Sequence, residues 1–257
     1  MNGARDSQPR GTAVSFGSMK WRFILGALAL TAAAPAPHKV VRSTPALDFS
    51  FEWPAEAVAI PALDLRMYKA AKAALADAQK NAAEDQALAK QQKRDFNQHD
   101  YSMRWTTAGQ TQRLLSLQSA YGGFEGGAHP NTSYGALLWD RKLDREISLS
   151  SLFLRSDAFS ALTRVRYCAA LHSERRKRRR GEKLSGEFDQ CPKFSDLAIS
   201  PIDSNKDGRF DMMAYVASPY VAGPYVEGEY EVSLPVTSQL IAAIKPEYRN
   251  SFARQRQ

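Results

Sequence analysis

The stretch "DSNKDGRFD", residues 203–211, has the residue types and the spacing of a calcium-binding loop. Calcium sites of this type place oxygen-bearing side chains at alternate positions, with a glycine at the sixth position for a sharp turn. The candidate ligands are Asp203, Asn205, Asp207 and Asp211. Ala214 occupies the twelfth position, where a bidentate glutamate is expected, so the site would need oxygens from other loops. A polar Asp-Gly hairpin turn explains the same residues without a metal.

A second candidate for function is the glycine-rich stretch "YGGFEGGAHPN", residues 121–131. Glycine loses more backbone freedom on folding than any other residue, so a tight hairpin has no need of four glycines in six residues. Gly126, Gly127, His129 and Asn131 could form a recognition surface of bare backbone donors and one imidazole. Alternatively the glycines adopt left-handed backbone angles, and His129 or Asn131 closes the loop by hydrogen bonding.

The sequence favours a non-catalytic protein. It contains no Gly-x-Ser-x-Gly elbow, no His-Glu-x-x-His helix and no phosphate-binding loop. Carboxylate pairs such as Glu227 and Glu229 lie beside glycines, where solvation is the default. A hydrolase that acts on peptidoglycan through carboxylates remains the alternative hypothesis.

Positive charge is concentrated in one segment, "ERRKRRR", residues 174–180. Its six cations, Arg175 to Arg180, compare with a formal net charge of +8 for the whole chain. Such a run repels itself and normally forms a solvated loop. The run could instead contact an anionic surface of the cell envelope. Nucleic-acid binding is not expected, because no aromatic residues are interleaved with the charges.

The N-terminal region has the layout of an exported protein. From Met19, basic residues precede an apolar run and then small residues, which predicts a signal peptide over residues 19–36. The apolar run is too short to span a membrane, so no membrane span is expected after cleavage. A buried N-terminal helix is the other interpretation. We expect a periplasmic or secreted protein with a loose extension at 1–18 and an extended leader at 37–48.

The two cysteines, Cys168 and Cys191, predict one disulfide in an oxidising compartment. Closing a loop of this length stabilises a fold by roughly 3 kcal/mol in the chain-entropy model. Two free buried thiols are the alternative.

The order of elements predicts an α+β domain over residues 49–250, with an antiparallel sheet packed against a long N-terminal helix and a second helix. The long helix is expected from residue 61 to about 94. Three strands follow as a meander, and the second helix begins at residue 157 with Ser156 as its cap and fades into the basic loop. The stretch "DMMAYVA", residues 211–217, is apolar on both faces and predicts a central strand. The expected elements are strands near 49–53, 101–106, 111–121, 132–139 and 228–235 and a last helix at 237–244.

Two segments together resemble a family of bacterial extracytoplasmic domains of unknown function. These segments are "GGAHPNTSYGALLWDRKLDREISLSSLF", residues 126–153, and "SPYVAGPYVEGEYEVSLP", residues 218–235. The resemblance covers roughly residues 48–250 and implies an α+β fold. Domains of this family form the outer part of lysozyme-sensing anti-sigma factors and the N-terminal module of some peptidoglycan deacetylases. The resemblance adds Tyr220 and Tyr225 to the candidate ligand-binding residues.

The resemblance implies binding of a lysozyme-like protein or of cell-wall material. Only 18 residues precede the predicted signal peptide with its short apolar run, and the chain ends at residue 257. We therefore expect a free-standing exported domain without the cytoplasmic part of an anti-sigma factor or the catalytic part of a deacetylase. The hypothesis is an exported, non-catalytic binding or sensing domain that requires no cofactor. A calcium-stabilised structural domain is the further alternative.

Overall fold

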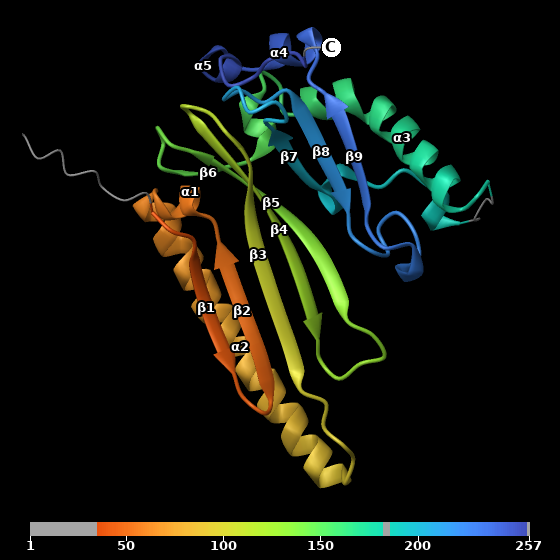
Figure 1. Ribbon diagram of the computed structural model, residues 1–257. Helices are drawn as coiled ribbons and strands as arrows, with labels where there is room; N and C mark the ends of the chain where they lie inside the picture. Colours follow the sequence, from red (N-terminus) through yellow and green to blue (C-terminus); the bar gives the residue numbers. More distant parts are fainter. Residues whose placement is uncertain (1–34, 182–185, 256–257) are drawn as a thin grey trace, which may run out of the picture. The chain divides into compact units, whose positions relative to one another are not determined.

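A computed structural model describes residues 35–181 and 186–255 of the chain (Figure 1). The predicted extension at 1–18, and the predicted signal peptide at 19–36 except for its last two residues, lie outside the described residues. Within the described part, none of the helices combines the length and the apolar character needed to cross a membrane.

The first half of the chain forms a six-stranded sheet in which the strands lie in sequence order. Its strands are β1 (His38–Ser43), β2 (Leu47–Trp53), β3 (His99–Gln110), β4 (Leu114–Phe124), β5 (Asn131–Asp140) and β6 (Arg145–Ile147). The expected meander is confirmed, because β3, β4 and β5 pair antiparallel. One pair in the predicted antiparallel sheet departs from this arrangement, because β2 pairs parallel with β3. A parallel pair needs a crossover connection, and the long helix supplies it. The segment expected to be a leader includes β1, which pairs with β2 along its whole length.

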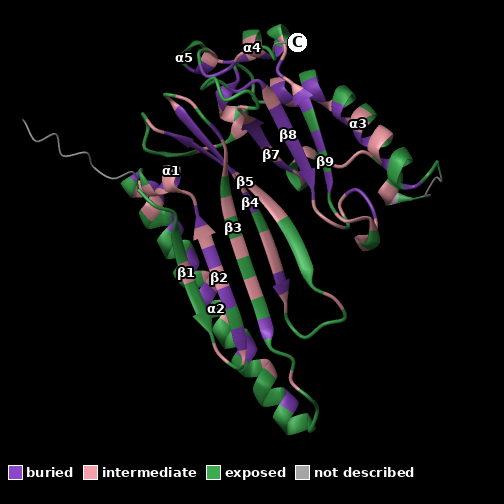
Figure 2. Ribbon diagram, viewed as in Figure 1, coloured by how far each residue is buried: buried purple, intermediate pink, exposed green. Residues whose placement is uncertain are grey.

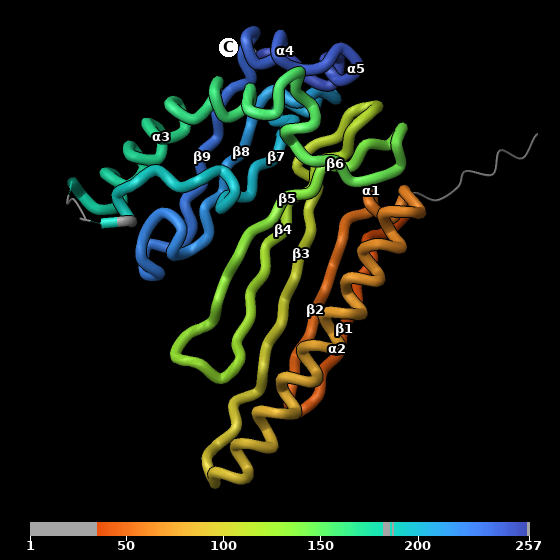
Figure 3. Tube along the Cα trace, turned by 180° about the vertical axis from the view of Figure 1, so that it is seen from behind, coloured from red at the N-terminus to blue at the C-terminus, as the bar shows by residue number. Residues whose placement is uncertain are grey.

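The long helix α2 (Pro61–Gln92) covers one face of this sheet (Figure 3). Pro61 fits the first position of a helix because its ring sets the backbone angle and its missing N–H would have no partner there. Lys93 ends the helix in a left-handed conformation, with φ of 52°. The short helix α1 (Ala55–Val58) precedes it. Apolar residues of α2 pack against alternate residues of β2 to β5, such as Phe49 and Leu117, to form one hydrophobic core.

The second half of the chain forms a three-stranded antiparallel sheet with a second core. Its strands are β7 (Ala198–Ile202), β8 (Met212–Ala217) and β9 (Tyr230–Pro235). The central position predicted for β8 is confirmed. The helix α3 (Ala158–Arg178) packs on this sheet, and α4 (Ser238–Ala243) and α5 (Pro246–Arg249) follow it near the C-terminus. The short turns of 3₁₀ helix are η1 (Leu149–Leu152), η2 (Glu187–Asp189), η3 (Phe194–Asp196) and η4 (Tyr225–Glu227).

The helix α3 differs from its prediction at both ends. Asp157 is the N-cap, so Ser156 is not, and Asp157 makes no side-chain capping bond. The helix does not fade before the basic run but continues through it to Arg178. Every fourth residue from Phe159 to Arg175 is buried, so the inner side of the helix stays packed into the basic run, while Figure 2 shows mainly its intermediate and exposed outer side.

The two sheets belong to one domain and are joined at two main places. Strand β7 contacts β3, β4 and β5, and Gln118 donates a hydrogen bond of 2.7 Å to Ser200. A Cβ at Gly109 would lie 2.7 Å from the backbone nitrogen of Asp203, so glycine is required for this approach.

The second junction is a buried ionic network at the upper end of β4 and β5. Arg113 donates two hydrogen bonds of 2.8 Å to the carboxylate of Asp140, which is fully buried. Tyr248, from α5, donates a third at 2.9 Å.

The predicted α+β class with one long helix is confirmed, and the interior is divided into two cores.

Candidate functional site

The glycine loop forms the tip of the β4–β5 hairpin and lies close to α2 at Asp85. Gly126 has φ of +77°, a conformation that L side chains rarely adopt. A Cβ at this position would lie 3.3 Å from a carboxylate oxygen of Asp85 on α2. Gly127 carries neither constraint. Glycine is therefore favoured at 126 by the backbone angle, and a Cβ there would also crowd the side chain of Asp85.

The other side of the loop meets the segment that carries the two Pro-Tyr pairs. The imidazole ring of His129 stacks on the ring of Tyr225, with centroids 3.9 Å apart and planes 23° apart. Its Nε2 lies 3.3 Å from the hydroxyl of Tyr220, and Tyr225 donates a hydrogen bond of 2.6 Å to the carbonyl of Pro130. We call His129, Pro130, Tyr220 and Tyr225 the clasp. The structure thus brings together three predicted site residues from segments about 90 positions apart.

The clasp presents aromatic surface to solvent. Tyr220 is 54% exposed and has φ of +70°, which is strained for a tyrosine. Val226, next to Tyr225, is 90% exposed. An exposed aromatic group held in a strained backbone conformation is typical of a recognition site rather than of a core. The remaining predicted site residue, Asn131, begins β5 and is exposed.

The basic run is not the solvated loop that its composition predicts. Arg175 is only 2% exposed and donates to three backbone carbonyls, those of Ala222, Asp189 and Gln190, at 2.9 to 3.3 Å. Arg178 donates to the carbonyls of Glu227 and Glu229. The backbone carbonyls accept the hydrogen bonds that water would accept from an exposed guanidinium, so these arginine side chains can be buried.

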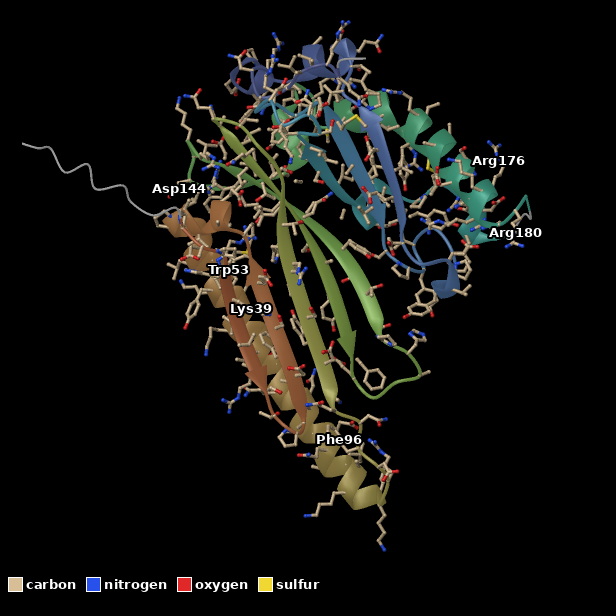
Figure 4. All side chains as sticks on the ribbon, viewed as in Figure 1. Lys39, Trp53, Phe96, Asp144, Arg176 and Arg180 are labelled. Atoms are coloured by element: carbon tan, nitrogen blue, oxygen red, sulfur yellow. A yellow bond between two sulfur atoms is a disulfide. The ribbon has the colours of Figure 1, made fainter. Side chains whose placement is uncertain are left out.

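Arg179 forms the centre of this network. It is 8% exposed and donates two hydrogen bonds, of 2.8 and 2.9 Å, to the carboxylate of Glu227. Tyr230 donates to the same carboxylate at 2.6 Å. The hydrogen bond from Arg179 holds the pKa of Glu227 below its ordinary value of 4.5, in spite of the opposing effect of burial. Because Glu227 follows Tyr225 by two residues, this pair anchors the backbone that carries the clasp. The cations Arg176, Lys177 and Arg180 remain exposed, and Arg176 and Arg180 project from the end of α3 (Figure 4).

The predicted disulfide between Cys168 and Cys191 is present, with Cα atoms 5.6 Å apart. It joins α3 to the segment that leads into η3. The carbonyls of Asp189 and Gln190, just before Cys191, are those that accept from Arg175. The disulfide therefore fixes two of the acceptors that hold this arginine.

The acidic side chains of the calcium-like loop are occupied by hydrogen bonds within the loop. Asp203 accepts from the backbone N–H groups of Asp207 and Gly208, and Asn205 also accepts from Asp207. Asp211 is buried and accepts from the N–H and hydroxyl of Ser204 at 2.8 and 2.7 Å. Over residues 35–181 and 186–255, no three His, Cys, Asp or Glu side chains lie close enough together to hold a metal ion. The calcium site stays a prediction, and the loop has a structural explanation of its own.

A small cavity of about 170 Å³ lies between the two sheets, beside the segment that leads from the clasp into β9. Its polar lining comes from both sheets. The lining side chains include Arg104, Gln118, Tyr134, Glu229 and Glu231. Of these residues, the sequence drew attention only to Glu229. The others lie on separate strands and form no motif that can be recognised in the sequence.

Comparison with known proteins agrees with this architecture. A family model described as "Deacetylase PdaC" matches residues 41–132, which contain the second half of β1, all of α2 and the glycine loop. A DUF3298 family protein from Pseudomonas aeruginosa PAO1 superposes with a TM-score of 0.53 and 15% identity, over 86% of this chain and 98% of that one. A DUF3298 family member from Bacteroides fragilis NCTC 9343 gives a TM-score of 0.52 and 13% identity, over 85% and 97% of the two chains.

These findings confirm the resemblance seen in the sequence. The chain has a DUF3298-type α+β fold, and residues 41–132 are similar to the PdaC family model. At such low identity the likeness to the two solved structures is one of fold. No curated protein matches the chain.

Proposed function

We propose that this protein is an exported, non-catalytic binding or sensing domain of the cell envelope, and that the clasp recognises a lysozyme-like protein or cell-wall material. The observation that carries the proposal is the clasp itself. Two segments far apart in the chain bring together one exposed tyrosine ring and two half-buried rings, and a largely buried ion pair holds one of the segments in place.

The chemistry of the clasp suits recognition better than catalysis. His129 faces two tyrosines and a backbone carbonyl, with no nucleophile or carboxylate among these partners. Stacked rings with hydroxyl groups at their edges offer rigid contact area and hydrogen bonding to a partner. Among the carboxylates expected to be solvated, Glu227 is instead engaged by Arg179. The exposed cations Arg176, Lys177 and Arg180 supply a separate contact for an anionic envelope surface.

The test is retention of the mature domain by immobilised hen lysozyme and by insoluble peptidoglycan at low salt. Low salt is needed because electrostatic contacts at exposed surfaces are screened. We expect Tyr220→Ala and Tyr225→Ala to reduce retention at least tenfold, as loss of an aromatic anchor does in other interfaces. Tyr68→Ala is the matched control, since Tyr68 is 49% exposed on α2, away from the clasp.

Each outcome points to one interpretation. Equal retention of the clasp variants and the control would reject the clasp as the binding site. Retention on peptidoglycan that is lost only when Arg176, Lys177 and Arg180 are changed to Gln would assign binding to the end of α3. Release of soluble fragments from peptidoglycan would contradict a non-catalytic role and favour the hydrolase alternative, with Glu229 and Glu231 as its carboxylates.

A further inference from the structure

We propose that the sheet face opposite α2, together with the adjoining wall of β9, is a docking surface for the cationic surface of a partner protein. This inference rests on the proposed function. It states that the partner bound at this surface is a protein and not an anionic polymer. We call this surface the outer face. Its charged residues are Lys39, Asp48, Glu52, Asp100 and Arg104 on the sheet and Glu229 and Glu231 on the wall.

The strand register places these side chains on one side of the sheet. Glu52 lies between Lys39 on β1 and Arg104 on β3, and Asp48 lies beside Asp100. The residues that alternate with them, such as Phe49 and Met103, pack against α2 in the first core. Successive side chains of a strand point to opposite faces, so the charged set points away from the helix. The charged residues of the sheet lie on three neighbouring strands, β1 to β3, which span about 10 Å at the usual strand spacing.

The outer face is open over β1 to β3. The second sheet covers its β4 and β5 side, where β7 contacts both strands and the backbone N–H of Tyr134 donates a hydrogen bond to Ser218. Asp100, Ser102 and Arg104 of β3 are exposed, as is Asp48 of β2. Figures 1 and 3 show α2 on one side of the sheet and no helix over β1 to β3 on the other. The face is therefore an unpartnered sheet surface that adjoins the cavity between the sheets.

The charge on this face is opposite to that of the chain. Five carboxylates and two cations give the outer face a net charge of −3, counted from the seven residues named above, whereas the chain carries +8. Among the described residues, none of these seven side chains takes part in a salt bridge. A cationic partner would supply the missing counter-charges, whereas an anionic polymer would be repelled.

One pair on the face shows that the charge is unfavourable in the isolated domain. Asp48 and Asp100 lie side by side in the parallel register of β2 and β3. Like charges at such positions destabilise a sheet. Burial, and then the neighbouring charge of Asp48, raise the pKa of Asp100 above its ordinary value of 3.8. A cation from a partner that binds between these carboxylates would relieve the repulsion.

The inference predicts that removing a negative charge from the outer face weakens binding of a cationic protein, and that removing a positive charge from the same face strengthens it. The probes are native hen lysozyme, lysozyme with its lysine amino groups acetylated, and poly-L-lysine, each measured against the whole mature domain. We expect the double variant Glu229→Gln/Glu231→Gln and the double variant Asp48→Asn/Asp100→Asn each to weaken binding of native lysozyme roughly tenfold at low salt. Arg104→Gln should strengthen it several-fold, because it removes a like charge. The control is Glu84→Gln on α2, an exposed carboxylate on the opposite side.

The outcomes separate this inference from the proposed function. If clasp variants abolish lysozyme binding while the four carboxylate changes leave it unaltered, the outer face is not the docking surface and the proposed function stands. If only poly-L-lysine binds, and the carboxylate variants lose that binding, the inference holds and lysozyme recognition fails. Equal binding of native and acetylated lysozyme, or failure of both lysozyme and poly-L-lysine to bind, would overturn the inference.

Discussion

At the scale of single residues, Asp140 shows how one buried carboxylate joins three parts of the fold. Burial alone would raise its pKa, but hydrogen bonds from Arg113, from the backbone N–H groups of Lys142 and Leu143 and from Tyr248 outweigh burial. The pKa therefore lies below the ordinary value of 3.8. An acid whose pKa is lowered by folding stabilises the folded state above its unfolded pKa, and this stabilisation is lost as pH falls through the folded pKa.

We expect the melting temperature to fall with acid below about pH 4, the ordinary range of carboxylate titration. Asp140→Asn should lower the free energy of unfolding at pH 7 by about 3 kcal/mol, since it leaves Arg113 without its charge partner. The variant should then show a shallower loss of stability in acid. Thermal melts from pH 3 to 7 measure both effects, and Asp77→Asn, an exposed change on α2, is the control. A parallel acid dependence in wild type and Asp140→Asn would contradict this role.

The glycine loop offers a second prediction at this scale. Gly126→Ala should reduce the free energy of unfolding by about 1–2 kcal/mol, the usual penalty for an L residue in left-handed geometry. Gly127→Ala, one position away and without contacts, should stay within about 0.5 kcal/mol of wild type. Chemical denaturation of the two variants side by side decides the matter. Equal effects would mean that the loop does not hold Gly126 against Asp85.

Residue identity predicted some of these features and hid others. The glycine cluster predicted an unusual loop, and the two cysteines predicted their disulfide. The buried state of His99, which is 3% exposed and lies 3.3 Å from Asp85, had no such signal because its partner is 14 positions earlier on a helix. The acidic residues at 203–211 matched a metal loop in spacing, but the same alternation also suits side chains that bond to backbone N–H groups.

At the scale of elements, α3 departs most from its expectation. Six consecutive cations predict a solvated segment, since like charges repel one another. The prediction was wrong because sequence alone cannot show where a helix will meet a neighbouring segment. In the fold, the helical period turns Arg175 and Arg179 toward the segment at 222–227 and leaves Arg176 and Arg180 exposed. Two residues of the same type, one position apart, thus have different roles.

The network predicts a clear difference between those neighbours. Arg179→Gln should lower the free energy of unfolding by about 2–3 kcal/mol, since Glu227 would stay buried without its ionic partner. Arg180→Gln should change it by less than about 0.5 kcal/mol, as an exposed substitution. Urea titrations provide the measurement. Similar losses in both variants would show that the run acts through net charge alone and not through this pair.

At the scale of the whole molecule, the sequence predicted the α+β class, the long helix and the central meander because each has strong local periodicity. The parallel pairing of β2 with β3 and the separate sheet of β7 to β9 depend on contacts between distant segments. The clasp and the outer face belong to this second group. Only the family resemblance hinted that the segments around His129 and Tyr225 act together, and nothing in the pattern of charges predicted an acidic face on a basic chain.

Strand β1 has a consequence for solubility. It is the outermost strand of the six-stranded sheet, and it is short, exposed and charged at Lys39 and Arg42. Such features discourage pairing of an edge strand with another chain. If processing removed residues 38–43, β2 would become the edge. Its backbone would then be free beside the aromatic side chains of Phe49, Phe51 and Trp53, a combination that promotes aggregation. The six residues of β1 therefore protect the edge of this sheet from pairing with another chain.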